Sequence, residues 1–358
     1  MNGKVSSGEV MAICVGVIFA MFPGFANSLI LNSSRNASLI SLLIAFVIGL
    51  IPIFMIMFIS KKIDTSFFDF TIKNFKGFGY VLNLVLLLLA IFTMTISTWF
   101  VMDFIISQFL TRSSYYLIAI FIAIIAAFCI NKGIETFLRS VFLLFIISVS
   151  VILILLFTII PYADISNLKP VVDVNIKDIM NSSFIFLTTL SPTFYILELK
   201  YITKDKKNFP RKILVGYIIV SLLIGFILFL IIAVYGIELG SLLTYPVYGL
   251  FKKVQIFGFI ERIENFAAIF LITAFFSQIA YFIYAIKDNI GTMFKIRNKT
   301  KKNILTYIIS IFIPIMSIYL FKTYELSLYI KYAPYILSIF YIILFIYFIR
   351  CLFLKKTT

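Results

Sequence analysis

Long runs of apolar residues alternate with short polar segments along almost the whole 358-residue chain. An apolar run of about 20 residues crosses the hydrocarbon core of a bilayer as an α-helix. We therefore expect an all-α integral membrane protein that forms one transmembrane domain over residues 1–358. The pattern predicts ten membrane-spanning helices, at residues 10–30, 38–60, 78–106, 115–131, 137–160, 180–199, 213–235, 258–286, 303–321 and 331–354.

Two of these apolar runs are interrupted near their centres. The first contains Phe-Pro-Gly-Phe at residues 22–25, and the sixth contains Leu-Ser-Pro-Thr at residues 190–193. Proline removes a backbone donor, so each break should free carbonyl and amide groups at membrane depth, where they are tolerated only if they line a cavity. Matched breaks in two halves of a chain indicate a transporter-type binding site. The predicted ligand-binding residues are Phe22, Pro23, Gly24, Phe25, Ala26, Trp99, Ser191, Pro192, Thr193 and Tyr195.

An ordinary proline kink is the alternative explanation for each break taken alone. Pro52, Pro314 and Pro334 interrupt other spans, and such kinks are common in membrane helices. The cavity is favoured because both breaks lie in the first helix of a five-helix half, beside small residues. Half-helix ends there would offer amide dipoles to a carboxylate and carbonyls to an ammonium group or cation, which suits a zwitterionic amino acid.

The ten spans divide into two groups of five, residues 10–160 and 180–354. Because five is odd, the second group enters the membrane from the opposite side and lies inverted relative to the first. The connection at residues 161–179 contains three aspartates and is expected to be a polar surface loop. We therefore expect an inverted repeat in which the two broken helices correspond.

The charge of the chain is strongly positive, with 31 Lys and Arg residues against 15 Asp and Glu residues. This excess raises the question of a nucleic-acid partner. If the N-terminus is cytoplasmic, however, most basic residues fall in cytoplasmic loops, as the positive-inside rule requires. We predict that both termini are cytoplasmic, that the basic loops contact membrane lipids and that no nucleic acid binds. The first span is too long for a cleaved signal peptide and is expected to remain.

Metal and catalytic chemistry find little support in the composition. The chain has no histidine, and its three cysteines, Cys14, Cys129 and Cys351, are far apart and lie in or at the ends of spans. No cluster of histidine, aspartate or cysteine is visible at membrane depth. We therefore expect no metal site, no cofactor and no enzymatic activity.

Four charged residues lie in or beside spans on the outer side. Asp103 is near the outer end of the third span, and Glu261, Arg262 and Glu264 open the eighth span from the same side. A charge at the bilayer centre costs at least ~2.5 kcal/mol, so it needs a partner or a purpose. Arg262 is expected to bridge to Asp103 as an outer gate. The alternative is that all four residues lie among the headgroups and are satisfied by water and by one another.

Three further polar residues are candidates for binding a coupling ion. Thr273 and Ser277 are one turn apart on the eighth span, where their hydroxyls would bind Na⁺ together with carbonyls freed by the first break. Alternatively, each hydroxyl bonds its own preceding turn. Glu198, toward the inner end of the sixth span, is expected to extend to the surface near Lys200 and Lys204, with a role in proton relay as the second possibility.

The most specific sequence segments are Tyr245-Pro246, then Phe-Ile-Glu-Arg-Ile-Glu at residues 259–264, and then Tyr-Phe-Ile-Tyr-Ala at residues 281–285. With ten spans and a Pro-Gly break in the first, they resemble the B-subunit family of endospore germinant receptors. That family belongs to the amino acid/polyamine/organocation transporter superfamily. The resemblance implies a LeuT-like 5+5 inverted repeat with helices 1 and 6 broken. The Ser-Pro-Thr-Phe sequence at residues 191–194 departs from the expected glycine-rich break, so ligand preference is not carried over.

The resemblance also implies a function. The protein would lie in the spore inner membrane, or in a bacterial plasma membrane, with a receptor A subunit and a lipoprotein C subunit. It would sense a small germinant, such as an amino acid, at the broken helices and signal germination. The alternative is an amino acid permease coupled to H⁺ or Na⁺, which needs the same cavity and a coupling-ion site in addition.

Overall fold

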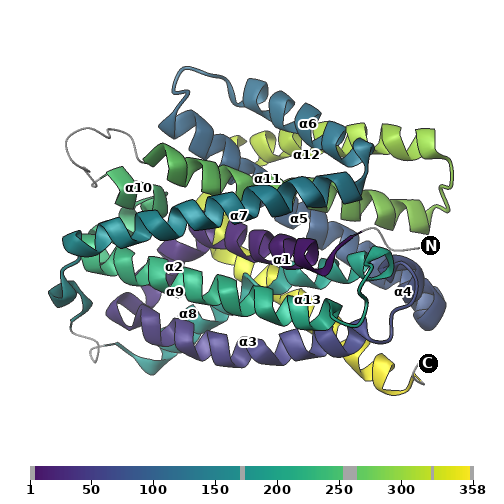
Figure 1. Ribbon diagram of the computed structural model, residues 1–358, viewed down its shortest axis with the longest axis horizontal. Helices are drawn as coiled ribbons and strands as arrows, with labels where there is room; N and C mark the ends of the chain where they lie inside the picture. The colour runs from purple at the N-terminus through teal and green to yellow at the C-terminus, as the bar shows by residue number, and fades with distance from the viewer. Residues whose placement is uncertain (1–4, 170–173, 253–263, 324–325, 355–358) are drawn as a thin grey trace.

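The computed structural model describes residues 5–169, 174–252, 264–323 and 326–354. These residues form a bundle of helices whose long axes run mostly side by side (Figure 1). The α-helices are α1 (Ser7–Met21), α2 (Asn27–Ser34), α3 (Ser38–Ser60), α4 (Phe67–Phe75), α5 (Gly77–Gln108), α6 (Tyr115–Lys132), α7 (Ile134–Ile159), α8 (Ile176–Thr188), α9 (Phe209–Leu242), α10 (Pro246–Lys252), α11 (Glu264–Met293), α12 (Lys299–Thr323) and α13 (Leu326–Leu352). Shorter or differently wound segments are η1 (Phe22–Ala26), η2 (Arg35–Ala37), η3 (Ile160–Tyr162), η4 (Ile165–Leu168) and η5 (Ser191–Ile202).

The second to tenth predicted membrane crossings are confirmed. Within the described ranges, nine helical stretches are long and apolar enough to cross a membrane, one of which joins α2 to α3. The apolar α1 is shorter because η1 ends it, and the chain then continues through η1 into α2 before turning at Arg35, where φ is 44°. The ten crossings are therefore α1–η1–α2, α3, α5, α6, α7, α8–η5, α9, α11, α12 and α13.

The broken segments lie in the interior of the bundle. Every residue of α1 from Ala12 to Met21 is buried, and so is every residue of η5 from Ser191 to Lys200. The helix α1 packs against α7, α9, α11 and η5. Outer helices instead expose large apolar side chains, such as Ile154 of α7, which is the surface that lipid would cover.

Local sequence explains where several helices begin. Ser6 and Glu9 form a capping box at the start of α1, since the Glu9 carboxylate accepts from the Ser6 N–H at 3.0 Å and the Ser6 hydroxyl accepts from the Glu9 N–H at 3.2 Å. The Asn175 side chain similarly caps α8 by accepting from the Lys177 N–H at 3.1 Å. These caps fix the starts of the first and sixth crossings.

Both termini lie at the same end of the bundle (Figure 1). At that end, the segment before α1 forms a parallel β-bridge between Val5 and Thr203, just beyond η5. The bridge consists of the Val5 N–H bonded to Ile202 O at 3.2 Å and the Lys204 N–H bonded to Val5 O at 2.9 Å. The start of the first crossing and the end of the sixth are thus tied together.

The structure differs from the sequence prediction in some of its details. The seventh crossing continues beyond the predicted residue 235 to Leu242, because Gly236 adopts φ 70° and lets the helix kink and resume. The short helices α4 and α10 lie in segments that we assigned to loops. The connection after α7 lies against α9, where Asp164 N–H and the Asn167 side chain both donate to Ala233 O at 2.9 Å.

Candidate ligand site at the two broken helices

The break in the first crossing is a single π-helical turn. Pro23 lacks an N–H, so the Phe19 carbonyl accepts from the Phe22 N–H, and the Asn27 N–H reaches five residues back to the Phe22 carbonyl. Such π turns insert one extra residue into a helix and often mark functional sites. The buried Phe22 ring stacks on Phe186 of α8, with centroids 5.9 Å apart and an interplanar angle of 8°. The first break therefore faces the helix that leads into the second break.

The break in the sixth crossing is a 12-residue 3₁₀ helix, η5, which replaces α-helix from Ser191 onward. Runs of 3₁₀ helix longer than three or four residues are uncommon, and in mid-helix they often mark hinges. Hydroxyls satisfy several carbonyls before it, since Thr188, Thr189 and Ser191 donate to the carbonyls of Ile185, Phe186 and Thr188 at 2.6–2.7 Å. This break is therefore already partly satisfied by its own side chains.

Each break also carries a buried polar side chain without a hydrogen-bond partner in the structure. Both polar atoms of the Asn27 amide, directly after η1, lack a partner, and so does the Thr193 hydroxyl in η5. Asn27 is 1% exposed and Thr193 is 0% exposed. A buried polar group left unpaired costs about 1–3 kcal/mol, so such groups require an explanation. These two side chains are therefore candidates for contact with a ligand.

The remaining predicted ligand-binding residues take different positions. Phe22, Pro23, Ala26, Ser191 and Pro192 are buried at the breaks. The Tyr195 hydroxyl instead bonds the Leu86 carbonyl of α5, and its own carbonyl accepts from Tyr281 at 2.7 Å, so this residue ties η5 to its neighbours. The sequence analysis did not include Asn27 among the ligand-binding residues. It could have been found as an uncharged polar residue in an apolar span, shortly after the Pro-Gly break.

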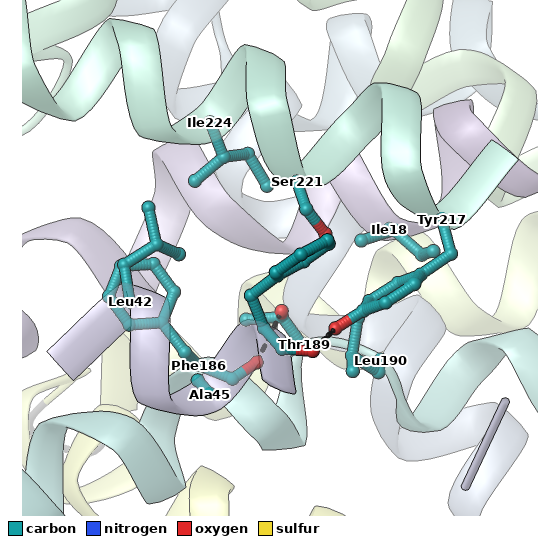
Figure 2. Close-up of a pocket in the computed structure, with 10 residues that line it drawn as sticks. Ile18, Leu42, Ala45, Phe186, Thr189, Leu190, Tyr217, Ser221 and Ile224 are labelled. Carbon is teal, nitrogen blue, oxygen red and sulfur yellow. Dashed lines mark hydrogen bonds between the residues drawn. The ribbon is translucent and has the colours of Figure 1, made fainter. Parts of the chain in front are cut away.

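A small cavity lies beside the breaks, between α1, α3, α8 and α9 (Figure 2). Its volume is about 20 Å³, which is room for one water molecule. Tyr217 and Ser221 reach into it from α9 toward Thr189 and Leu190, which follow α8 (Figure 2). The Tyr217 hydroxyl donates to Phe46 O at 2.7 Å. This cavity by itself is too small for an amino acid.

Helix α11 contacts the first crossing just before its break. The Gln278 side chain donates to Val17 O of α1 at 3.2 Å and accepts from the Ser97 hydroxyl of α5 at 2.6 Å. One residue earlier, Ser277 lies so close to Gly16 that a Cβ on Gly16 would be 2.7 Å from the Ser277 hydroxyl oxygen. The turn of α1 before the break is therefore clamped between α5 and α11.

Comparison with known proteins agrees with this architecture. The family profile described as "Spore germination protein" matches residues 4–325. The chain belongs to this family. A curated relative, spore germination protein KB of Bacillus subtilis (strain 168), is 24% identical over 201 residues, which is 54% of this chain and 52% of that protein. The match thus spans about half the length of the relative.

The fold of this family member is LeuT-like. It resembles the substrate-bound, outward-open structure of a Na⁺-coupled sialic acid symporter, with a TM-score of 0.62 and 14% sequence identity. The similarity covers 94% of this chain and 78% of the symporter. The predicted all-α integral membrane fold, with its first and sixth helices broken, is confirmed.

In this family member, the outer cluster is built around Asp103. Its carboxylate accepts hydrogen bonds from the hydroxyls of Tyr115 and Tyr245, both at 2.8 Å. Burial and the charge of Asp103 raise the pKa of Tyr245 well above its usual value, so the phenol remains a donor. Trp99 joins this cluster by stacking on Tyr115, with centroids 5.0 Å apart. Glu264 begins α11.

Glu261 and Arg262 lie outside the described residues, so the proposed bridge to Asp103 stays a prediction. Within the described part of the chain, the two tyrosine hydroxyls hold Asp103.

Glu198 lies inside the protein, contrary to the expectation that it extends to the surface. It is 0% exposed, and its carboxylate accepts from the Ser66 hydroxyl at 2.8 Å and the Phe67 N–H at 2.7 Å. Those groups form the N-terminus of α4, where the helix dipole favours a negative charge. The sequence could not show this because α4 approaches η5 only in the fold. Lys200, meanwhile, bonds the Lys206 carbonyl.

Thr273 and Ser277 are brought together on one wall of a cavity between α6, α7 and α11. The Ser277 hydroxyl donates to Ala274 O in its own helix at 2.8 Å, which is the arrangement named as the alternative to ion binding. Their role with a coupling ion stays a prediction, as does that of Glu198.

Proposed function

We propose that this chain is the ligand-binding membrane subunit of a spore germinant receptor. It senses a small germinant, preferably an amino acid, between the two broken helices. The observation that supports this most directly is the pair of unpartnered polar groups, the Asn27 amide and the Thr193 hydroxyl, one at each break. An amide can donate to a carboxylate and accept from an ammonium group, and a hydroxyl can do either. Membership in the germination family supports the biological setting.

The signal requires a difference in affinity between two arrangements of the bundle. A ligand held between the breaks favours the arrangement that it binds better, and a tenfold preference corresponds to about 1.4 kcal/mol. Transport is not required for such a signal. The receptor assembly includes an A subunit and a lipoprotein C subunit in the spore inner membrane, and both termini of this chain are cytoplasmic. The chain binds and signals, and it does not catalyse a reaction.

Binding of radiolabelled amino acids to the purified protein tests this proposal. The Asn27→Leu variant keeps a similar volume but loses the amide, so affinity should fall by roughly tenfold or more. Asn181→Leu is the matched control, because Asn181 is exposed and its side chain bonds Ser33. Saturable binding that Asn27→Leu leaves unchanged, in protein that is correctly inserted, would place the ligand elsewhere.

A permease coupled to H⁺ or Na⁺ is the second candidate. It is supported by the similarity of the fold to a Na⁺-coupled symporter and by the polar residues Thr273, Ser277 and Glu198. Uptake into proteoliposomes distinguishes the two candidates. Concentrative uptake driven by an H⁺ or Na⁺ gradient would identify a transporter, whereas saturable binding without such uptake would identify a receptor.

A further inference from the structure

A second, larger cavity lies on the side of the bundle and is lined by α6, α7 and α11. Its volume is about 330 Å³. That is roughly twice the volume of an engineered apolar protein cavity of about 150 Å³ that binds benzene. Its walls are mainly apolar, and they include Phe128, Phe137, Val141, Leu144, Ile272 and Phe276. A cavity of this size and character suits a flexible hydrocarbon chain better than a polar solute.

The cavity continues into the outer apolar surface of the protein. Two of its lining residues are largely exposed, Phe128 at 57% and Leu144 at 46%. They lie on α6 and α7, which are both membrane-spanning helices. The surface around them faces lipid in an integral membrane protein, so an acyl chain can enter the cavity sideways without leaving the bilayer.

One end of the cavity carries a positive charge. Lys132, the last residue of α6, lines the cavity and is exposed, and its ammonium group lies 5.2 Å from the centre of the Phe128 ring. The turn from α6 to α7 lies at the same end of the bundle as the two termini (Figure 1). Long basic side chains at the ends of membrane helices reach the headgroup level. The hydroxyls of Thr136 and Ser140 also line this region.

The geometry points to a binding site for one anionic phospholipid of the surrounding membrane. Its phosphate lies at Lys132, and one of its acyl chains fills the cavity between α6, α7 and α11. At the inner wall of the cavity the acyl chain contacts Ser277. This residue lies against Gly16 of α1, six residues before the first break. The lipid therefore supports the contact between α11 and α1. This site is independent of the germinant site between the breaks.

Photocrosslinking in lipid nanodiscs locates the acyl chain. The probe is phosphatidylglycerol with a diazirine on one acyl chain, compared with phosphatidylcholine carrying the same group. Mass spectrometry of the wild-type protein should find label concentrated on Phe128, Leu144 and Phe276. Ser140→Trp, which places an indole in the cavity, should remove most of this label. Leu143→Trp is the matched control, since Leu143 is 62% exposed on the same helix and does not line the cavity.

The contact between Lys132 and the lipid phosphate is tested by a separate variant. Lys132→Gln should lower the preference for phosphatidylglycerol over phosphatidylcholine about fivefold, the factor that corresponds to ~1 kcal/mol for one basic residue near an anionic surface. Lys301→Gln, at an exposed lysine on α12, should leave the preference unchanged. Label spread evenly around the membrane belt in the wild-type protein would overturn the site. Cavity labelling with no preference for the anionic lipid would overturn the assignment to an anionic phospholipid. Labelling displaced by a copurifying protein subunit would assign the groove to that subunit instead.

Discussion

The two broken helices differ in how the backbone is wound at the break. The first is widened by one π turn of five residues, η1, and resumes as the α-helix α2. The sixth is tightened into 12 residues of 3₁₀ helix, η5, which continues to the end of the crossing. The first break is thus a local defect in a helix, whereas the second changes the winding of half a crossing.

This difference gives the two breaks different capacities for movement. A 3₁₀ helix rises about 2.0 Å per residue and an α-helix about 1.5 Å, so rewinding η5 as α-helix would shorten it by roughly 6 Å. The single π turn has no comparable reserve of length. In addition, Gly16 and Val17 hold the first crossing tightly against α11. We therefore expect the first break to be the fixed side of the ligand site and η5 to be the side that moves.

The largest loss of stability is expected when the contacts of η5 beyond the break are removed. Glu198→Ala removes the buried carboxylate that accepts from Ser66 and Phe67, and leaves these donors of α4 unpaired. The free energy of unfolding should fall by about 3 kcal/mol, because two buried donors lose a charged acceptor. Thermal unfolding of the detergent-solubilised protein measures this loss. Glu198→Gln keeps an acceptor of the same shape and should lose less. An unchanged midpoint in Glu198→Ala would mean that α4 does not hold η5.

The fixed side is tested by Gly16→Ala. The added methyl group would lie 2.7 Å from the Ser277 hydroxyl oxygen, so either this hydroxyl must turn away from the Ala274 carbonyl or α1 and α11 must separate slightly. The expected cost is about 2 kcal/mol of unfolding free energy. In the double variant Gly16→Ala/Ser277→Ala the oxygen is gone, and most of the stability should return. Equal losses in the single and double variants would show that this close contact is not what fixes the first crossing.

The positions of the breaks could be predicted from the sequence, but their forms could not. Pro23 and Pro192 stand out in apolar runs, and the length of those runs gives the ten crossings. Whether a proline produces a π turn or a 3₁₀ segment depends on which groups satisfy the freed carbonyls. At the second break these are hydroxyls, whose geometry only the fold specifies. Similarly, Glu198 looks like a surface carboxylate until α4 is packed against η5.

The polar groups at the breaks predict effects of opposite sign on stability and binding. Thr193→Val removes a buried hydroxyl that has no hydrogen-bond partner among the described residues, so the free energy of unfolding should rise by about 1 kcal/mol. Affinity for the germinant should fall at the same time. Thr188→Val is the matched control in the same crossing, because its hydroxyl already donates to Ile185 O at 2.7 Å, and it should not stabilise the protein. If both variants lose stability equally, the Thr193 hydroxyl is not an unpaired group that is available to a ligand.

The smallest effect is expected from the prolines themselves, and it separates the two breaks most directly. In Pro23→Ala the new N–H lies four residues after the Phe19 carbonyl, which in the wild-type protein accepts from the Phe22 N–H, so the π turn can return to α-helix. In Pro192→Ala the corresponding Thr188 carbonyl already accepts the Ser191 hydroxyl at 2.6 Å, so a new N–H gains little. Stability should change by less than about 1 kcal/mol in either variant. Hydrogen exchange should show stronger protection of the amides at residues 23–27 in Pro23→Ala and almost no change around η5 in Pro192→Ala. Equal protection gained at both breaks would mean that the hydroxyls of the sixth crossing do not satisfy its carbonyls, and that the two breaks are alike.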